Sequence, residues 1–248
     1  MAPINPTRDA FFKGWNSNRL HKQRIGGSLS PVHIHEYRLD PKKWSNGRAR
    51  KSRQRRRASS VAVTVDCILG QSKEELTCLV CSEFPENCKG SECYAEWRLG
   101  PPQRLRDCIE IRDTGTQVGD GAFVKPGRRV KKGKYLGEYL GELLPPDSEV
   151  SGMYTFDIRG VARVHAGACG NLTRFFNHSC QHNVDSFVEL VGGRQIIVFQ
   201  AKRDIEENEQ ILINYGAEYF RDNKLACACT AEKCRFKQVG QLITYTFI

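Results

Sequence analysis

The chain has 248 residues and a formal net charge of +10, from 38 Lys and Arg against 28 Asp and Glu. This length suits one sizeable domain with a smaller appendage, and the positive charge favours acidic partners such as nucleic acid or chromatin without specifying a fold. No apolar run approaches the roughly 18 residues of a membrane span, and the N-terminus carries no apolar stretch resembling a secretion signal.

Residues 1–60 show no helical or strand period and are expected to form a flexible basic segment. The run from Lys42 to Arg57 is rich in Lys and Arg and contains no acidic residue, so its charges repel one another and favour an extended chain. A nuclear-import signal or a contact with the DNA phosphate backbone would explain this run, and a merely solvated tail is the alternative.

Residues 61–104 are expected to form a cysteine-rich segment that opens with a short strand over 61–65. Eleven cysteines in a chain without a signal favour metal ligation over disulfides. Four of them follow the spacing C-x2-C-x6-C-x4-C, which suits tetrahedral zinc coordination by Cys78, Cys81, Cys88 and Cys93. Cys67 and Cys108 are near enough in sequence to replace one of these ligands, and four unrelated thiols are the alternative.

From about residue 105 the pattern changes to short apolar runs separated by glycine-rich and polar turns. The expected strands cover 108–112, 122–124, 135–143 with a glycine interruption, 153–158, 186–191, 195–201 and 210–215. Gly192-Gly193 between two of them predicts a β-hairpin. No long amphipathic helix is apparent, so the fold is expected to be mainly β, a β-rich α+β arrangement.

Residues 170–183 combine aromatic rings, amides, imidazoles and a thiol in a mixture that no regular amphipathic element requires. Each polar side chain here would need a hydrogen-bond partner if it were buried, which favours a functional site. A capped turn with Cys180 as a small buried hydrophobe is the alternative.

The C-terminal segment contains C-x-C-x4-C, formed by Cys227, Cys229 and Cys234. Three neighbouring thiols leave a tetrahedral structural site one ligand short. Cys180 is the expected fourth ligand, and Cys169 is its rival.

Taken in this order, these motifs resemble the SET-domain protein lysine methyltransferases over residues 105–236. Gly119-Asp120-Gly121-Ala122-Phe123 is similar to the family's cofactor loop, and Glu138-Tyr139-Leu140-Gly141-Glu142 to its EYxGE motif. The segment 170–180 resembles GNxxRFxNHSC, and 211–216 resembles the last strand with its tyrosine. The C-x-C-x4-C tail looks like the post-SET zinc segment, in which Cys180 would be the fourth ligand.

The resemblance implies an S-adenosylmethionine-dependent enzyme with a SET domain over 105–220, built from several small sheets with a knot-like C-terminal crossing. A post-SET zinc segment and tail would follow over 221–248. Tyr215 would orient the substrate amine, while Tyr139 and Tyr154 would line the reacting centre or simply pack in the core. The residues expected to hold the cofactor are Gly119, Asp120, Gly121, Ala122, Tyr154, Arg174, Asn177, His178, Tyr215 and Phe236. Turn capping is the alternative for Asn177 and His178, and Arg174 either meets a carboxylate or anchors the fold.

The sequence departs from the family pattern at three points. His182 stands where a proline often precedes the asparagine matched by Asn183, and Val164-His165-Ala166 lacks the aspartate frequently found before the GN motif. The cluster Cys78–Cys93 does not reproduce the nine-cysteine, three-zinc arrangement of the heterochromatin-type enzymes. These departures weaken assignment to that subfamily, although not to the superfamily.

The expected chemistry needs a neutral lysine amine, which costs about 4–5 kcal/mol at pH 7 for an ordinary lysine. A dry channel and a nearby positive charge both reduce that cost, so a site rich in Tyr, Phe and Asn and poor in carboxylates suits the reaction. Ile213 stands where a tyrosine tends to restrict the family's product to monomethyl-lysine, so di- or trimethylation is expected.

The sequence therefore predicts a zinc-stabilised lysine methyltransferase of nuclear chromatin. Its substrate would be a histone tail or nucleosome, and the basic N-terminal run would contact DNA. A catalytically silent zinc module that binds chromatin or nucleic acid is the alternative.

Overall fold

A computed structural model describes residues 24–25, 28–29, 32–48, 63–70, 76–100, 106–116, 118–150, 152–236, 238–239 and 242–243. The basic run beyond residue 48 and the tail from residue 244 lie outside these ranges. None of the helices in the described part of the chain has the length and apolar character needed to cross a bilayer.

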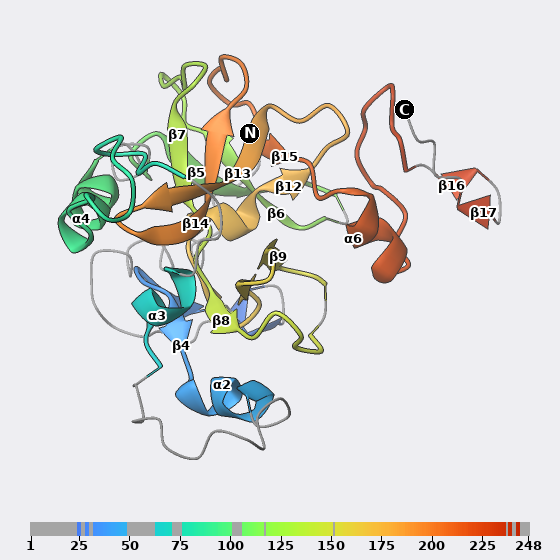
Figure 1. Cartoon of the computed structure of the whole chain (residues 1–248). Coiled ribbons are helices and arrows are strands. Elements are labelled where there is room, and N and C mark those ends of the chain that lie inside the picture. The colour runs from blue at the N-terminus through green and yellow to red at the C-terminus, as the bar shows by residue number, and fades with distance from the viewer. Residues whose placement is uncertain are drawn as a thin grey trace.

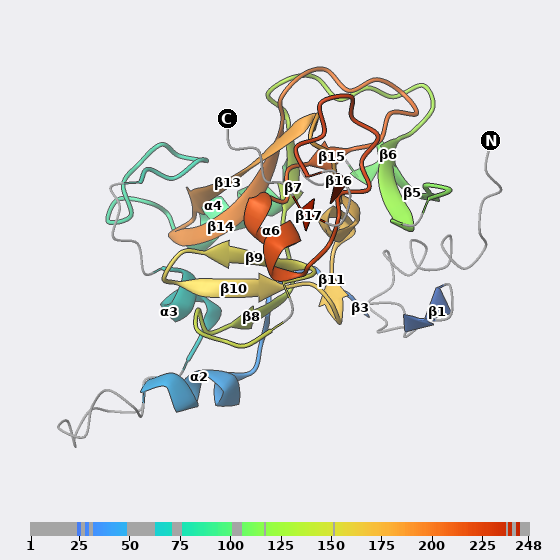
Figure 2. The same cartoon turned by 90° about the vertical axis from the view of Figure 1, so that its right-hand side faces the viewer.

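Short strands dominate the structure and are joined into several small sheets (Figures 1 and 2). The strands are β1 (Arg24–Ile25), β2 (Ser28–Leu29), β3 (Val32–His33), β4 (Arg38–Leu39), β5 (Ile109–Asp113), β6 (Asp120–Val124), β7 (Tyr135–Glu138), β8 (Glu142–Leu144), β9 (Thr155–Ile158), β10 (Ala162–His165), β11 (Cys169–Gly170), β12 (Asn177–His178), β13 (Val184–Val191), β14 (Arg194–Ala201), β15 (Leu212–Ile213), β16 (Gln238–Val239) and β17 (Leu242–Ile243). The helices are α2 (Pro41–Arg48), α3 (Val65–Leu69), α4 (Ser91–Leu99), α6 (Ala217–Asp222) and the 3-10 helix η2 (Leu172–Phe175). The predicted fold class, mainly β in several small sheets, is confirmed.

Two sheets carry most of the core. One has the strand order β4-β8-β10-β9 and the other β13-β14-β7, while β5-β6, β3-β11, β12-β15, β1-β2 and β16-β17 form two-stranded sheets. Figure 2 shows β8, β10 and β9 side by side. Three phenylalanine rings meet edge to face between these sheets. The ring centroid of Phe199 lies 5.9 Å from that of Phe156 and 5.1 Å from that of Phe176.

The predicted hairpin is confirmed as β13 and β14, which pair in register from Val184↔Ala201 to Val191↔Arg194. Gly192 and Gly193 form its turn with φ angles of +57° and +78°, a conformation that favours glycine. A Cβ on Gly192 would also lie 2.3 Å from the Gly90 carbonyl oxygen. The hairpin tip is therefore packed against the start of α4.

The expectation of an unstructured segment over residues 1–60 is wrong for 32–48. There β3 pairs in parallel with β11, and β4 pairs in parallel with β8. Tyr37 is buried, and the Trp44 Nε1–H donates to the Leu143 carbonyl oxygen at 3.1 Å. The segment is ordered because it adds strands to sheet edges and places aromatic rings against the core.

Residues 65–69 form helix α3, so the strand predicted over 61–65 is wrong at its end; residues 61 and 62 are not described. The Thr64 side chain accepts a hydrogen bond from the Cys67 backbone N–H at 3.2 Å, and Asp66 lies in the first turn. These are helix-starting features, and they outweigh the strand preference of the neighbouring valines.

Candidate active site and thiol clusters

The site is built where two distant segments cross. β12 and β15 pair in parallel, with Asn177 opposite Leu212 and His178 opposite Ile213. The fully buried Asn183 joins the same segments through its side chain. Its Oδ1 accepts the Leu212 N–H at 2.8 Å, and its Nδ2 donates to the Gln210 carbonyl oxygen at 2.8 Å. The crossing is therefore held by side-chain amide bonds as well as by a very short strand pair.

Tyr215 follows β15 and points back to the crossing. Its hydroxyl donates to the Phe176 carbonyl oxygen at 3.0 Å, and its backbone N–H donates to His178 Nδ1 at 3.1 Å. Burial raises the pKa of the Tyr215 phenol well above its ordinary value. The phenol is therefore neutral, and because its proton is donated to Phe176, its oxygen lone pairs remain available as acceptors.

Three further tyrosines surround Tyr215. The Tyr219 ring meets the Tyr215 ring edge to face at 4.6 Å, and the Tyr139 hydroxyl donates to the Tyr154 carbonyl oxygen at 2.9 Å. After burial, Tyr219, Tyr139 and Tyr154 are the main causes of the raised Tyr215 pKa, which places all four phenols near one another. The structure thus brings together the three predicted tyrosines. It adds Tyr219, whose place four residues after Tyr215 gives no recognisable sequence signal.

Arg174 lies over Tyr154, with its guanidinium carbon 4.4 Å from the ring centroid, and its Nε donates to the Ala166 carbonyl oxygen at 3.0 Å. Tyr154 is 46% exposed and has a φ of +59°, which is uncommon for a non-glycine residue. Of the two roles considered for Arg174, these contacts favour an anchor of the local fold that also places a positive charge beside the tyrosines.

The predicted cofactor loop is tied to the crossing. Asn177 Nδ2 donates to the Asp120 carbonyl oxygen at 3.0 Å, and the Ile211 N–H donates to the Ala122 carbonyl oxygen at 2.8 Å. Gly119 has a φ of +76°. A Cβ on Gly121 would lie 2.3 Å from Gln210 Nε2 and 2.9 Å from Asn177 Nδ2, so a larger residue here would push these two side chains aside.

Aromatic rings form a wall at His178. Its ring centroid lies 4.7 Å from that of Phe220, which in turn stacks on Phe236 at 4.7 Å with an interplanar angle of 24°. Burial, helped by the nearby Arg235 charge, lowers the pKa of His178 to about 4. The imidazole is therefore neutral at pH 7, as its acceptance of the Tyr215 N–H requires. Phe220 was not identified from the sequence, because it lies in the short helix α6 after the matched motif.

The C-terminal thiols converge on Cys180. Ligand atoms of His178, Cys180, Cys227 and Cys229 lie within 4.8 Å of one another, and Cys234 Sγ lies 3.8 Å from Cys180 Sγ. A tetrahedral zinc ion with Zn–S bonds of about 2.3 Å holds its sulfur ligands about 3.8 Å apart. The four predicted thiols fit such an ion. The rival ligand Cys169 lies in β11 opposite Val32, outside this group.

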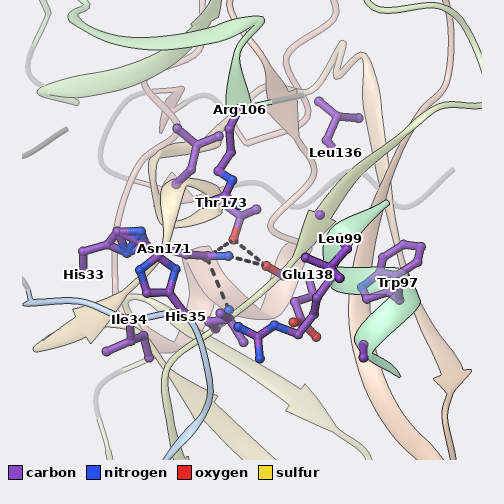
Figure 3. A pocket seen from close by; sticks show the side chains of 15 residues that line it. His33, Ile34, His35, Trp97, Leu99, Arg106, Leu136, Glu138, Asn171 and Thr173 are labelled. Carbon is purple, nitrogen blue, oxygen red and sulfur yellow. Dashed lines mark hydrogen bonds between the residues drawn. The ribbon is translucent and has the colours of Figure 1, made fainter. Parts of the chain in front are cut away.

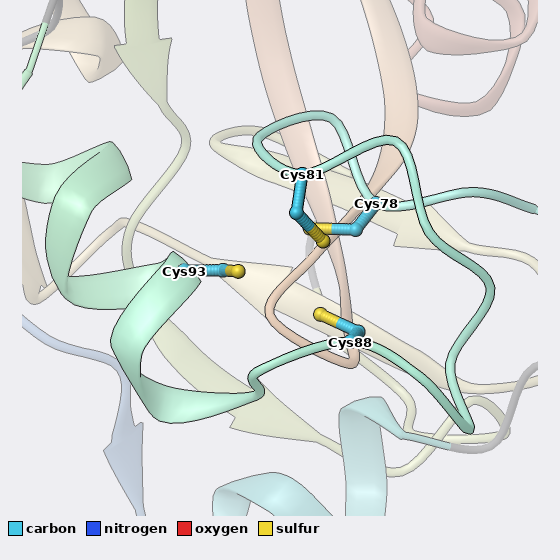
Figure 4. Close-up of side chains that lie close together, drawn as sticks. All are labelled: Cys78, Cys81, Cys88 and Cys93. Atoms are coloured by element: carbon cyan, nitrogen blue, oxygen red, sulfur yellow. The ribbon is translucent and has the colours of Figure 1, made fainter.

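The second thiol cluster contains Cys78, Cys81, Cys88 and Cys93, whose sulfur atoms lie within 4.8 Å of one another (Figure 4). Cys93 lies on α4. The Gly192 N–H donates to Cys78 Sγ at 3.3 Å and the Leu79 N–H donates to the Leu190 carbonyl oxygen at 2.8 Å, so the cluster is attached to the tip of the β13–β14 hairpin. Burial raises the pKa of Cys78, but the N–H groups of Gly192, Cys81 and Val80 bring it to about 7, which favours the thiolate a metal needs. Cys67 and Cys108 are outside the group.

Ile213 is 1% exposed and packs in the core next to the crossing. Its expected influence on the methylation product stays a prediction.

Known proteins resemble this chain in sequence. A family model described as "SET domain" matches residues 121–216. The variant-silencing SET domain-containing protein of Plasmodium falciparum is 29% identical over 188 residues, which cover 68% of this chain and 7% of that protein. Histone-lysine N-methyltransferase trithorax of Drosophila virilis is 34% identical over 117 residues, or 43% of this chain and 3% of that protein. A crystal structure of Arabidopsis thaliana SUVH6 in complex with SAM is 25% identical with a TM-score of 0.45, covering 51% of this chain and 32% of that one.

This chain therefore matches the SET-domain family over residues 121–216, as its motifs predicted. It spans only a small fraction of the length of the curated relatives it matches, 7% and 3% in the two cases above.

Proposed function

We propose that this chain is an S-adenosylmethionine-dependent protein-lysine N-methyltransferase that di- or trimethylates a histone tail lysine in nuclear chromatin. The observation that carries the proposal is the placement of the Tyr215 hydroxyl. It is buried among tyrosines, bonded to the Phe176 carbonyl, and adjacent to the crossing of β12 and β15. The relatives named as histone-lysine N-methyltransferases support the substrate class.

The residues around the crossing suit the proposed cofactor. Gln210 Nε2 is a buried donor with no hydrogen-bond partner among the described residues, and it lies beside Gly121. Such a donor next to a glycine loop suits a polar ligand, while His178, Phe220 and Phe236 offer aromatic faces to a planar base. Asn177, His178, Phe236 and the loop 119–122 would hold the cofactor, which when bound supplies an electrophilic methyl group on a sulfonium.

The tyrosine cluster would bind and orient the lysine amine. After burial, the groups that most affect the pKa of Tyr215 are three other tyrosines and Arg174. A nearby guanidinium and a dry surrounding both favour the neutral amine. Hydroxyl and carbonyl oxygens that accept its N–H groups would fix its direction, and alignment of this kind is a large part of catalysis in a displacement.

Zinc would act structurally in this proposal. The ion held by Cys180, Cys227, Cys229 and Cys234 would tie the segment carrying Phe236 to the crossing, and the ion held by Cys78, Cys81, Cys88 and Cys93 would fix α4 against the hairpin. Four thiolates leave no open position for a substrate or water.

The test is methyl transfer from labelled S-adenosylmethionine to recombinant nucleosomes by the zinc-loaded chain, followed by mass-spectrometric mapping of the modified lysine. Tyr215→Phe should reduce the rate by about 10²-fold or more, because it removes the orienting hydroxyl. Tyr135→Phe is the matched control, since it removes a phenol hydroxyl from β7 outside the cluster, and it should leave the rate nearly unchanged.

Calorimetry with S-adenosylmethionine separates the ways in which this proposal can fail. Binding heat without nucleosome methylation would contradict the histone substrate and leave the methyltransferase activity to be tried on other basic proteins. No binding heat would contradict the enzyme assignment and favour a catalytically silent chromatin-binding module.

A further inference from the structure

A cavity of about 350 Å³ lies between α4, the β3–β4 segment and the β7–η2 region, apart from the tyrosine cluster (Figure 3). Its volume falls at the lower end of the range for small-ligand pockets, about 300–1,000 Å³. We propose that this cavity binds a small organic anion, a carboxylate or phosphate monoester carried on an apolar body. This proposal is independent of the methyltransferase assignment.

The first argument is the charge on the cavity wall. Arg98 and Arg106 both line it, together with His33 and His35, whose ring centroids are 4.6 Å apart. Burial, then His35 and Arg106, lower the pKa of His33 to about 4, and burial, then Arg106 and Arg98, lower that of His35. The imidazoles are therefore neutral at pH 7. The two guanidinium groups supply positive charge and hydrogen-bond donors suited to carboxylate or phosphate oxygens.

The second argument concerns the acidic groups that the structure describes near these arginines, which are Glu138, Glu36 and Asp107, the last acting on the Arg106 charge. Among the described residues on the cavity wall, only Glu138 carries a carboxyl group; it is 5% exposed and accepts the Tyr94 hydroxyl at 2.9 Å. Glu36 pairs with Arg98 at 2.5 Å, but its side chain is 72% exposed, and an ion pair of this kind contributes little. An anion entering the cavity can take the place of Glu36.

The third argument is the apolar side of the cavity. Trp97 and Leu99 lie across the cavity from the two histidines in Figure 3. Leu99 is 72% exposed, the highest value among the exposed large hydrophobic side chains of the described residues. A ligand with an apolar body would cover it while its anionic group meets the arginines. This combination favours an organic anion over inorganic phosphate alone.

The cavity floor makes the site rigid. Asn171 Nδ2 and the Thr173 hydroxyl both donate to the Glu138 carbonyl oxygen, at 2.8 and 3.2 Å. The single Thr173 hydroxyl proton is shared with Asn171 Oδ1, which lies 2.7 Å from the hydroxyl oxygen. These polar groups are satisfied within the protein, so the floor does not have to reorganise to admit a ligand, which favours binding.

The test is fluorine NMR on the zinc-loaded full chain with 4-fluorobenzoate and 4-fluorophenyl phosphate, and with neutral 4-fluorobenzyl alcohol for comparison. At least one anionic probe should bind with a dissociation constant on the order of 1 mM or tighter. A ligand of roughly ten non-hydrogen atoms, such as these probes, can reach this affinity. The neutral probe should bind at least about tenfold more weakly, the difference expected for one charged hydrogen bond.

Variants locate the binding. Arg98→Gln and Arg106→Gln should each weaken the anionic probe about tenfold, whereas Arg129→Gln, which removes another ion-paired surface arginine, should not. Leu99→Glu should weaken binding more than Leu99→Gln, since the two side chains differ only in charge. Because Leu99 is exposed, both variants are expected to fold.

Three results with the fluorinated probes would overturn the proposal. In the first, neither anionic probe binds at a concentration 10-fold above the expected dissociation constant. In the second, the neutral probe binds as tightly as the anionic probes. In the third, the arginine variants bind the anionic probe with unchanged affinity. Displacement of the probe by a short DNA duplex at far lower concentration would also overturn it, because the cavity would then belong to a nucleic-acid surface.

Discussion

Asn183 offers the sharpest test of how the active site is held together. Its side chain is fully buried and bonds the Leu212 N–H, the Gln210 carbonyl and Glu209 Oε1, at 2.8, 2.8 and 3.0 Å. Asn183→Ala leaves the Leu212 N–H and the Gln210 carbonyl without this partner, and each unsatisfied buried group costs about 1–3 kcal/mol of stability. The substitution also opens a small cavity. We therefore expect a loss of about 3–5 kcal/mol in the free energy of unfolding.

The assay is urea unfolding of the zinc-loaded chain, with thermal unfolding in parallel. At about 2–4 °C per kcal/mol for a chain of this size, the melting temperature should fall by about 10 °C. Asn183→Asp is the matched variant, because it keeps the volume and the acceptor for Leu212 but loses both donors and places a carboxylate beside Glu209.

The Asp variant should also be strongly destabilised at pH 7, and its deficit should shrink as the pH falls. Burial and the Glu209 charge raise the folded-state pKa of the new carboxyl, and the protonated form regains a donor. A loss below about 1 kcal/mol for Asn183→Ala would refute the view that this amide holds the crossing. A deficit in Asn183→Asp that does not change with pH would contradict the reasoning that a buried charge and a lost donor cause it.

Three further predictions concern the metal, a buried acid and the product. Cys227→Ser should lower the zinc content from two ions per chain to one by atomic absorption, because the two thiol clusters are separate; retention of two ions would contradict the ligand set. Burial raises the pKa of Glu138 to about 7, so the native chain should lose about 3 kcal/mol of stability as the pH rises from about 4.5 to 7. Glu138→Gln should remove this pH dependence of stability, as measured by urea unfolding at several pH values. If the variant lost stability with rising pH as steeply as the native chain, other groups would be the cause. Ile213→Tyr should shift the product toward monomethyl-lysine by mass spectrometry, because a phenol crowds the amine, and an unchanged distribution in a folded variant would reject this role.

The elements that the sequence predicts well are those with local signals. The hairpin β13–β14 has two glycines at its turn and eight-residue strands, and β5 and β6 are also found close to their expected ranges. The thiol clusters were predictable for a different reason. Metal ligation restricts residue type and spacing, so counting ligands predicts a fourth ligand for the C-terminal cysteines, with Cys180 and its rival Cys169 as the candidates.

Helix α4 was not predicted, although three of its nine residues are buried: Cys93, Tyr94 and Trp97. The helix is too short to show more than one repeat of the helical period. Its stability comes from contacts made elsewhere, since Tyr94 bonds Glu138 and Trp97 meets the Tyr135 ring edge to face at 5.3 Å. A helix that depends on tertiary packing leaves little trace in its own residues.

The same reasoning explains why the sequence did not predict the strands β3 and β4, and why it did not predict the cavity beside them. The strands β3 and β4 have two residues each, and their partners β11 and β8 follow more than 100 residues later. Local pattern cannot indicate such pairs, because each strand is stabilised only by the edge to which it adds. His33, His35, Arg98 and Arg106 become neighbours through this addition and through the position of α4. A site assembled from three non-contiguous segments without motifs of their own is therefore invisible to spacing rules. The Tyr215 site also joins distant segments, but most of them carry a recognisable motif.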